Sequence, residues 1–316
     1  MKILVAPLNW GLGHASRCVP VIQTLVARKH DVTIAGDGMS LRYLCMYFPE
    51  LPYKEAPQLH LQYSKGNSQI GSMFRQLPTL FRFIRKDHKW IEEIVRRHHF
   101  DLVISDNRFG LYTSLTRTAY ITHQIMVKMP QGLTFAEKWG YRLHRFFIDK
   151  YNYCLIPDYP GTPNLSGDLS HKYPLPHNAR FIGPLSRFMH APSIQPNCTY
   201  DVVAIISGLE PHRTLLEQQV LQTYAHKKEK VLVLEGRIGE QPHPTISDNI
   251  HIVSHMEDHE LLPYLVGCKK IICRSGYSSI MDLDALHLLH KATLIATPGQ
   301  TEQEYLAQLH QTQNSI

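Results

Sequence analysis

The chain has 316 residues, of which 43% are hydrophobic, and this length suits two domains of roughly 100–200 residues each. Its formal net charge of +6 is modest and no nucleic-acid-reading module accompanies it, so nucleic acid is not an expected partner. No run reaches the ~18 apolar residues of a membrane span, and the apolar start of the chain is too short for a signal peptide. The six cysteines are scattered without paired short spacings, so we interpret them as reduced packing residues and expect a cytoplasmic protein.

The first half of the chain alternates short apolar runs with longer segments of helical period. This alternation is typical of βαβ units that build a parallel sheet. We expect strands at 2–7, 31–35, 102–105, 119–122 and 154–157. We expect the main helices of this half at 14–28, 73–98 and 135–151. The first half is therefore predicted to be a Rossmann-like α/β domain.

The composition changes at residues 157–196, where proline, glycine and asparagine are frequent, so a linker or a surface loop is expected there. A second alternating series follows, with strands at 201–206, 230–234, 249–254, 270–273 and 293–296 and helices at 211–226, 258–267 and 277–289. The sequence thus predicts an α/β protein of two Rossmann-like domains, 1–183 with the linker at its end and 184–316, facing across a cleft that suits a ligand.

A glycine turn follows the first strand, where Gly11 and Gly13 allow a tight bend before a helix that starts near His14. A dinucleotide fingerprint would place a third glycine at position 16 and an acidic residue about 20 positions further on. Asp37 suits the acidic role, but Ser16 stands at the third glycine position. An NAD site and a connection without any ligand therefore both remain alternatives for this turn.

The second half carries a strand that ends in Ser275 and Gly276 and leads directly into a helix. Backbone amides and the positive end of the helix dipole converge at such a turn and can hold a phosphate. Ser278 and Ser279 add hydroxyl donors in the first turn of the helix. Asp282 lies on the same helix, where its carboxylate could reach a ribose, although a solvated surface position would explain it as well.

The segment 271–305 resembles the nucleotide-binding half of GT-B glycosyltransferases, and most of all the peptidoglycan N-acetylglucosaminyltransferase (MurG-like) family. That family has a Cys-Arg-Ser-Gly turn, an acidic residue on the next helix that binds ribose, and a glutamine segment that contacts the donor sugar. By this resemblance Ser275, Gly276 and Ser279 hold the nucleotide, Asp282 binds its ribose, and Gln303 contacts the sugar with Glu302 or Glu304 nearby. Asp282 is shorter than the glutamate of the family.

Further segments resemble the same family along nearly the whole chain. Arg187 corresponds to a linker arginine that approaches the diphosphate, and Ser207 and Gly208 lie at its second glycine loop, with a looser match. Met256 falls where the uracil edge is packed. The front turn, with Gly11 and Gly13, resembles a Gly-Gly-His turn on the acceptor side. Members of the family usually continue beyond the glutamine segment, so the donor half ending at Ile316 is expected to be shortened.

The resemblance implies inverting transfer of a sugar from a nucleoside diphosphate, most simply UDP, to an acceptor hydroxyl. No metal or other cofactor is expected, because we identify no Asp-x-Asp signature that would hold a cation against the diphosphate. His14 is the candidate general base, and Asp106 is either a second base or the group that orients His14, with helix capping or loop hydrogen bonding as the alternative for each. His123 is expected on the acceptor side.

Three other functions remain as alternatives: a UDP-sugar 2-epimerase of the same fold, an NAD-dependent oxidoreductase that uses the Gly11–Gly13 turn, and a non-catalytic nucleotide-binding protein. Two basic, aromatic stretches, 81–90 and 139–147, would suit the surface of an anionic membrane. They would equally suit ordinary amphipathic helices with their aromatic side chains in the core. A peripheral position at the inner face of the membrane and a lipid-linked acceptor follow from the first interpretation.

Overall fold

The computed structural model describes residues 1–59, 69–130, 132–189, 191, 193–208, 210–237, 241–244 and 247–313, with the backbone alone for 69–75, 312 and 313. The chain divides into two compact units, Met1–Arg187 and Phe188–Ile316. Within the described residues, none of the helices is both long enough and apolar enough to cross a membrane.

Unit 1 is built on a sheet of seven parallel strands in the order β3-β2-β1-β4-β5-β6-β7. The strands are β1 (Lys2–Pro7), β2 (Asp31–Gly36), β3 (Tyr53–Glu55), β4 (Leu102–Asp106), β5 (Arg117–Ile121), β6 (Tyr153–Ile156) and β7 (Ala179–Phe181). The central strand β1 is buried from its second residue onward, because helices cover both faces of a parallel sheet and leave no polar face.

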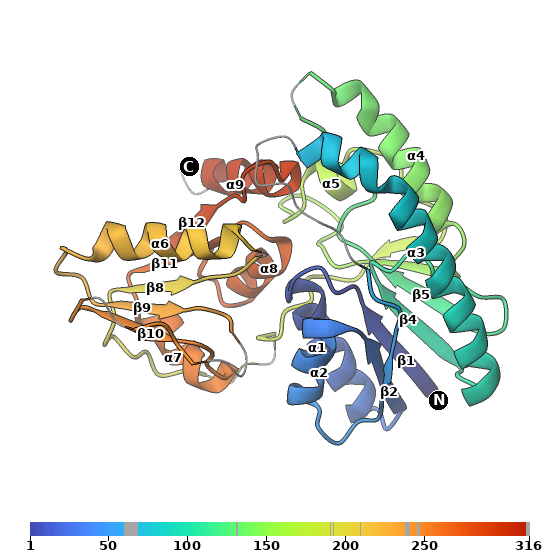
Figure 1. Cartoon of the computed structure of the whole chain (residues 1–316), viewed down its shortest axis with the longest axis horizontal. Coiled ribbons are helices and arrows are strands. Elements are labelled where there is room, and N and C mark those ends of the chain that lie inside the picture. Colours follow the sequence, from blue (N-terminus) through green and yellow to red (C-terminus); the bar gives the residue numbers. More distant parts are fainter. Residues whose placement is uncertain are drawn as a thin grey trace. The chain divides into compact units, whose positions relative to one another are not determined.

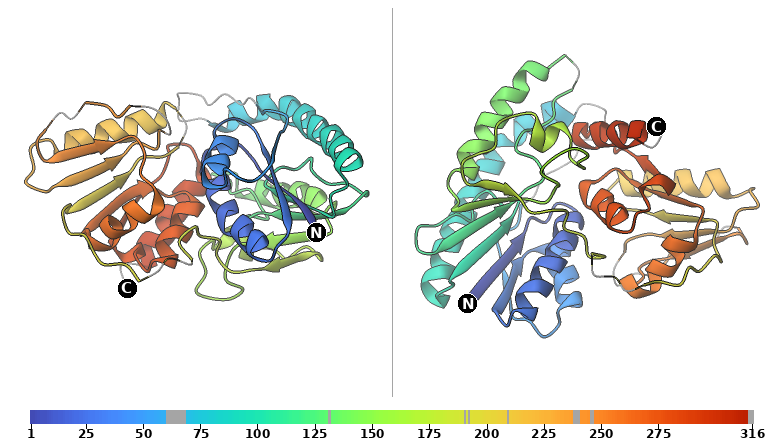
Figure 2. Two further views of the ribbon diagram at one scale, coloured as in Figure 1. Left: turned by 90° about the horizontal axis from the view of Figure 1, so that it is seen from below. Right: turned by 180° about the vertical axis from the view of Figure 1, so that it is seen from behind.

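Helices cover both faces of this sheet (Figures 1 and 2). They are α1 (Gly13–Ala27), α2 (Gly38–Tyr47), α3 (Gln69–His98), α4 (Glu137–Ile148) and the short α5 (Asp168–His171), with a 3-10 turn at Thr134–Ala136. Helix α3 packs Ile91, Ile94 and Val95 on one face, against Leu4 and other side chains of the sheet. Helices α1 and α2 lie on the opposite face (Figure 1).

The strand order of unit 1 reverses beside β1, because β2 pairs with one edge of that strand and β4 with the other. Pro7 at the end of β1 is in register with Asp106 at the end of β4. In doubly wound sheets such a switch point, at the carboxyl ends of the strands, is the preferred place for a ligand. The loop after β1 and the last residue of β4 therefore meet where chemistry is expected.

Unit 2 has a five-stranded parallel sheet in the order β10-β9-β8-β11-β12. Its strands are β8 (Val202–Ile205), β9 (Val231–Leu234), β10 (Ile250–Val253), β11 (Lys270–Arg274) and β12 (Ala292–Ile295). Its helices are α6 (His212–Tyr224), α7 (Asp258–Gly267), α8 (Tyr277–Ala285) and α9 (Thr301–Gln313), with a 3-10 turn at Leu289–Lys291. Leu216, Val220 and Tyr224 of α6 pack on one face of the sheet, and α7 lies on the other (Figure 1).

The segment 157–196, where a linker or surface loop was expected, is mostly loop and turn in its described residues, but it contains two short elements of unit 1. Residues up to Arg187 belong to unit 1, and within them β7 adds a seventh parallel strand while α5 forms one short turn. Elements of three and four residues are too short to show a hydrophobic period, which is why the sequence pattern resembles a loop there. Helices α2 and α9 and strand β3 were also not predicted.

Candidate functional site

A buried polar cluster lies at the switch point of unit 1 and joins α1 to the end of β4. His14 Nδ1 lies 2.7 Å from Oδ1 of Asp106, whose side chain is fully buried. Arg17 lies one helical turn after His14 and donates from Nε and Nη2 to both oxygens of the same carboxylate. The guanidinium of Arg17 therefore balances the charge of Asp106, while the carboxylate holds the imidazole in place.

The protonation states within this cluster follow from its burial and its charges. Burial by itself would raise the pKa of Asp106, but Arg17 and His14 outweigh it and hold that pKa below its usual value. Burial, followed by the charge of Arg17, lowers the pKa of His14, although Asp106 works in the opposite direction. His14 is thus neutral at pH 7. Nδ1 of His14 lies 2.7 Å both from Oδ1 of Asp106, which only accepts, and from Nη2 of Arg17, which only donates. A proton on Nδ1 pairs with the carboxylate and leaves the lone pair on Nε2, and this is the tautomer that a general base requires.

The structure brings His123 to the same cluster, where its Nδ1 lies 3.0 Å from Nη1 of Arg17. Gly11 has a φ of 79°, a left-handed conformation that favours glycine, so its residue type is explained by the turn itself. Gly13 is the first residue of α1. Arg17 therefore connects His14, Asp106 and His123 in one cluster at the carboxyl end of the sheet.

Both oxygens of Asp37 already accept hydrogen bonds from residues of unit 1, so its carboxylate has a structural task apart from the ribose contact of the NAD alternative. Its Oδ1 accepts a hydrogen bond of 3.0 Å from Arg108, and its Oδ2 accepts one of 3.1 Å from Asn9. Arg108 is itself fully buried and also donates to Asp87. Asp37 is a structural partner that ties the front loop to the core of unit 1.

In unit 2 the turn between β11 and α8 has the expected form, but Ser275 contributes differently from what its hydroxyl suggested. Ser275 is fully buried, and its Oγ donates to the backbone carbonyl of Gln303 at 2.8 Å. Its hydroxyl therefore fastens the turn to α9. Gly276 is the N-cap of α8 and is half-buried. The first amides of a helix have no acceptor within the helix, so any anion at this turn would meet backbone donors.

The glutamine segment is held close to the same turn by its own side chains. Gln303 Oε1 accepts a hydrogen bond of 2.9 Å from the amide of Thr297, and its Nε2 donates to Gln300 at 2.6 Å. Glu304 accepts from the amide of Gly299 at 3.0 Å, whereas Glu302 lies in the first turn of α9. The structure thus joins the segment to Ser275, and the amide group of Gln303 shapes the loop after β12.

Asp282 and Ser279 both lie on α8 and are half-buried. Asp282 and Asp284 have Asp-x-Asp spacing, which the sequence analysis did not assign to a cation clamp. Residues two apart on a helix point to different faces, so these two carboxylates cannot grip one cation together. The expected ribose contact of Asp282 requires only its single carboxylate.

Met256 lines a cavity of about 480 Å³ beside the end of β10, together with His255, Glu260 and Tyr264. An apolar thioether at the wall of a cavity of this size suits a flat base. The expected position of Met256 is thus compatible with a nucleobase site in unit 2.

The connection between β8 and α6 offers a less open anion site than expected. Gly208 has a φ of 109° and Ser207 is half-buried, but Glu210 caps the helix by accepting from the amide and hydroxyl of Thr214. Arg213 pairs with this carboxylate at 2.8 Å, so Glu210 already occupies both an amide in the first turn of the helix and a nearby cation that a phosphate could use. Arg187 ends unit 1, where its Nη1 donates to the Tyr43 hydroxyl at 3.1 Å. Leu209 lies outside the described residues.

Arg17 is the member of the unit 1 cluster that the sequence analysis missed. Its spacing of three from His14 places both side chains on one face of α1, and this signal was available from the sequence. The buried carboxylate of Asp106 requires a cation beside it, so a basic residue at this spacing is the partner to look for.

The chain resembles known proteins in sequence and in fold, although no family model matches it. A protein of Methanosarcina acetivorans named an uncharacterized glycosyltransferase is 24% identical over 324 residues, which cover 96% of this chain and 80% of that protein. The SsfS6 glycosyltransferase of Streptomyces sp. SF2575 has a TM-score of 0.54 at 10% identity, covering 99% of this chain and 96% of that one. Phytolacca americana UGT2, solved with UDP-2fluoro-glucose and pterostilbene, has a TM-score of 0.59 at 13% identity, with coverages of 97% and 82%.

These comparisons confirm the expected fold, GT-B, with two Rossmann-like α/β units, and the expected class of enzyme, glycosyltransferase. They do not single out the MurG-like family among GT-B proteins. A putative UDP-N-acetylglucosamine 2-epimerase of Listeria monocytogenes also has a TM-score of 0.52 at 10% identity, covering 99% of this chain and 89% of that one. The fold is therefore shared by transferases and by an epimerase.

Proposed function

We propose that this protein transfers a sugar from a nucleoside diphosphate, most simply UDP, to an acceptor hydroxyl, with inversion and without a metal in the chemical step. The observation that carries the proposal is the buried pair of His14 and Asp106, held by Arg17 at the carboxyl end of the unit 1 sheet. A neutral imidazole oriented through Nδ1 by a carboxylate is the arrangement expected of a general base.

The chemistry assigns one task to each unit. In unit 1, Nε2 of His14 takes the proton of the acceptor hydroxyl as its oxygen forms a bond to the anomeric carbon of the donor. The bond from that carbon to the diphosphate breaks, and its electron pair leaves with the phosphate oxygen. In unit 2, the amides at Gly276 and the start of α8 stabilise the negative charge on the leaving diphosphate. Asp282 holds the ribose, and Gln303 with Glu302 meets the sugar.

The competing functions are supported less well by the same geometry. An NAD-dependent oxidoreductase would need the carboxylate of Asp37, and both of its oxygens are already engaged. A 2-epimerase would share the nucleotide turn, so likeness of fold alone does not separate it from a transferase. Transfer is favoured because the relatives named from sequence are glycosyltransferases.

A melting-temperature panel tests the donor directly. We expect UDP or a UDP-sugar to raise the melting temperature, because a ligand that binds only the folded state stabilises it, by about 2.7 kcal/mol at a hundredfold excess over Kd. NAD should leave it unchanged. Asp282→Ala should remove most of the shift with nucleotide, whereas Asp284→Ala on the same helix is the matched control and should retain it. Stabilisation by NAD alone would overturn the proposal.

The outer face of α4 supports contact with an anionic membrane, and hence a lipid-linked acceptor. Trp139, Leu143 and Phe146 share one face of the helix and are 67%, 48% and 58% exposed. Arg142 lies beside them and stacks on the ring of Trp139 at 5.3 Å. Exposed aromatic rings flanked by cations are the pattern of a helix that lies on a lipid surface.

The two basic, aromatic stretches differ in how far their large apolar side chains are exposed. In the 81–90 stretch Phe83 and Ile84 are buried, so the interpretation as an ordinary amphipathic helix applies to much of it. Around α4, Tyr141 and Phe147 fill the core while the opposite face keeps its large apolar side chains in solvent. The proposed membrane contact therefore rests on α4.

Flotation with vesicles tests this contact. We expect binding to vesicles with anionic lipid that weakens at high salt, because part of the attraction is electrostatic. The double substitution of Trp139 and Phe146 by serine should weaken it strongly. Leu215→Ser, which removes a 53% exposed side chain from unit 2, is the control and should bind as the unsubstituted chain does. Equal binding of all three proteins, or none, would contradict the contact.

A further inference from the structure

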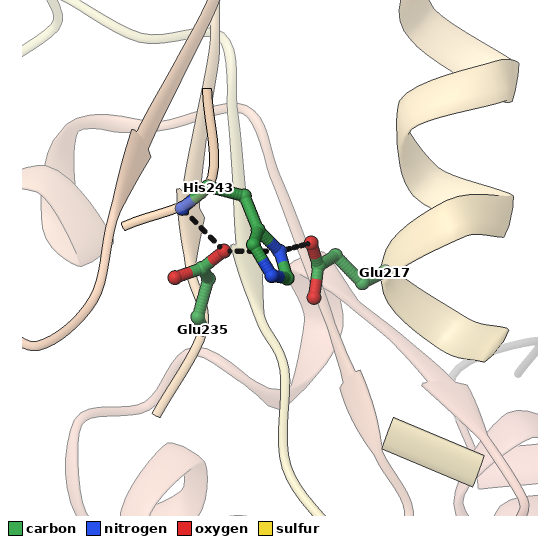
Figure 3. Close-up of side chains that lie close together, drawn as sticks. All are labelled: Glu217, Glu235 and His243. Carbon is green, nitrogen blue, oxygen red and sulfur yellow. Dashed lines mark hydrogen bonds and ion pairs between the residues drawn. The ribbon is translucent and has the colours of Figure 1, made fainter. Parts of the chain in front are cut away.

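Three ionisable side chains meet at the carboxyl edge of the unit 2 sheet, in a cluster that the sequence analysis did not single out. Glu217 comes from α6, Glu235 directly follows β9, and His243 comes from the described segment 241–244. Figure 3 shows the imidazole ring of His243 between the two carboxylates. Each residue offers one ligand atom, and these three atoms lie within 4.8 Å of one another.

Among the described residues, the cationic groups that the structure places beside these two carboxylates are Arg237 and His243. Glu217 is 3% exposed and Glu235 is fully buried, so two carboxylates lie out of contact with bulk water. Arg237 lies 3.7 Å from Glu217, which is too long for a hydrogen bond and provides one positive charge. Buried carboxylates are costly unless paired cations or metals compensate them. Arg237 supplies one charge, and the second must come either from His243 in its charged form or from a bound cation.

The hydrogen bonds of the cluster leave two of its oxygens without donors. His243 Nδ1 lies 2.6 Å from Oε1 of Glu217 and 2.9 Å from Oε1 of Glu235, and a ring nitrogen carries at most one proton. The other oxygen of each carboxylate, Oε2 of Glu217 and Oε2 of Glu235, is buried and has no hydrogen-bond partner within the part of the chain that the structure describes. Buried acceptors of this kind are uncommon in native proteins and call for a ligand.

We propose that Glu217, Glu235 and His243 bind one divalent transition-metal cation, of the Zn²⁺ or Mn²⁺ class. Two carboxylate oxygens and one imidazole nitrogen form a ligand set suited to these cations. The side chain of His243 is 43% exposed, so water can complete the coordination from the solvent side. Metal–ligand bonds of about 2.0–2.2 Å separate neighbouring ligand atoms by about 3.0–3.5 Å. His243 Nδ1 now lies 2.6 and 2.9 Å from the two carboxylate oxygens, so a small outward movement of the exposed ring would make room for the cation.

The cation would act on structure and not on the leaving diphosphate. Strand β8 separates β9, which ends just before Glu235, from β11, which leads to Gly276. Two strand spacings put about 10 Å between these positions. The metal would thus cross-link α6 to the end of β9 within unit 2, and this inference does not depend on the reaction that the protein catalyses.

Metal binding to the chelator-stripped protein tests the inference, with Zn²⁺ and Mn²⁺ as the probes. We expect one equivalent of one of these cations to bind, measured by calorimetry and by elemental analysis after dialysis, and to raise the melting temperature. His243→Ala removes a half-exposed ring and should fold normally, yet lose at least ~10-fold in affinity. Glu235→Gln should lose binding as well, while its metal-free form melts no lower than the unsubstituted chain because one of two facing charges is gone.

The control must account for the 20 histidines of the chain, which could bind cations weakly elsewhere. His259→Ala removes an imidazole that is 77% exposed and lies beside a single glutamate in the same unit. It should bind the cation as the unsubstituted protein does. If neither cation binds, or if binding is the same in His243→Ala, Glu235→Gln and the control, the proposed site is wrong.

Discussion

Replacing His14 by alanine is expected to reduce turnover by roughly 10²–10⁴-fold and to leave the affinity for the nucleotide unchanged. The imidazole lies on α1 in unit 1, whereas the residues proposed to hold the nucleotide belong to unit 2. Loss of the base therefore removes proton transfer without removing donor contacts. Product formation measures the first effect, and a titration with nucleotide followed by calorimetry measures the second.

The pH dependence of the unsubstituted enzyme gives a second test of His14 as the general base. His14 acts in its neutral form, and burial lowers its pKa, so the rate should rise with pH through a midpoint below 6.5 and then level off. His177→Ala, which removes a 75% exposed ring in unit 1, is the control and should keep both the rate and the profile. Turnover by His14→Ala at the unsubstituted rate would exclude this histidine as the base.

Much of this cluster could be predicted because it depends on local order along the chain. The run 2–7 and the glycine turn after it predict a strand followed by a helix, and β1 is found with the same bounds. His14 and Asp106 each follow or end a buried strand, so the sequence placed both at one edge of a parallel sheet. Their contact at 2.7 Å required the further fact that β1 and β4 are neighbours, which only the strand order supplies.

Other features could not be predicted because their causes lie in packing. Ser275 suggested a hydroxyl open to a ligand, yet it is buried because α9 packs beside the turn and offers the carbonyl of Gln303. The role of Asp37 depends on Arg108, which is 71 residues away and buried. Long-range pairs of this kind leave no periodic signal in the sequence. The same is true of Glu217 and Glu235, which α6 and β9 bring together.

Gly276→Ala is expected to leave the fold intact and to weaken nucleotide binding by at least ~10-fold, or about 1.4 kcal/mol. The φ of Gly276 is −71° and its ψ is 141°, which any residue adopts, and a Cβ built there would meet no atom within 4 Å. The protein itself therefore does not require glycine at this position. A phosphate that approaches the amides closely does require it, because a methyl group would occupy the space beside them.

Two matched substitutions make this result decisive. Gly161→Ala also places its Cβ in open space, in unit 1, and should change neither stability nor binding. Gly110→Ala would put a Cβ 2.4 Å from Cβ of Asp87, so it should lower the melting temperature and show that the assay detects a steric clash. Alanine restricts the unfolded chain, so Gly276→Ala should melt at the unsubstituted temperature or slightly above it. If it binds nucleotide as the unsubstituted chain does, the phosphates lie elsewhere, and the amides that open α8 do not stabilise the leaving group.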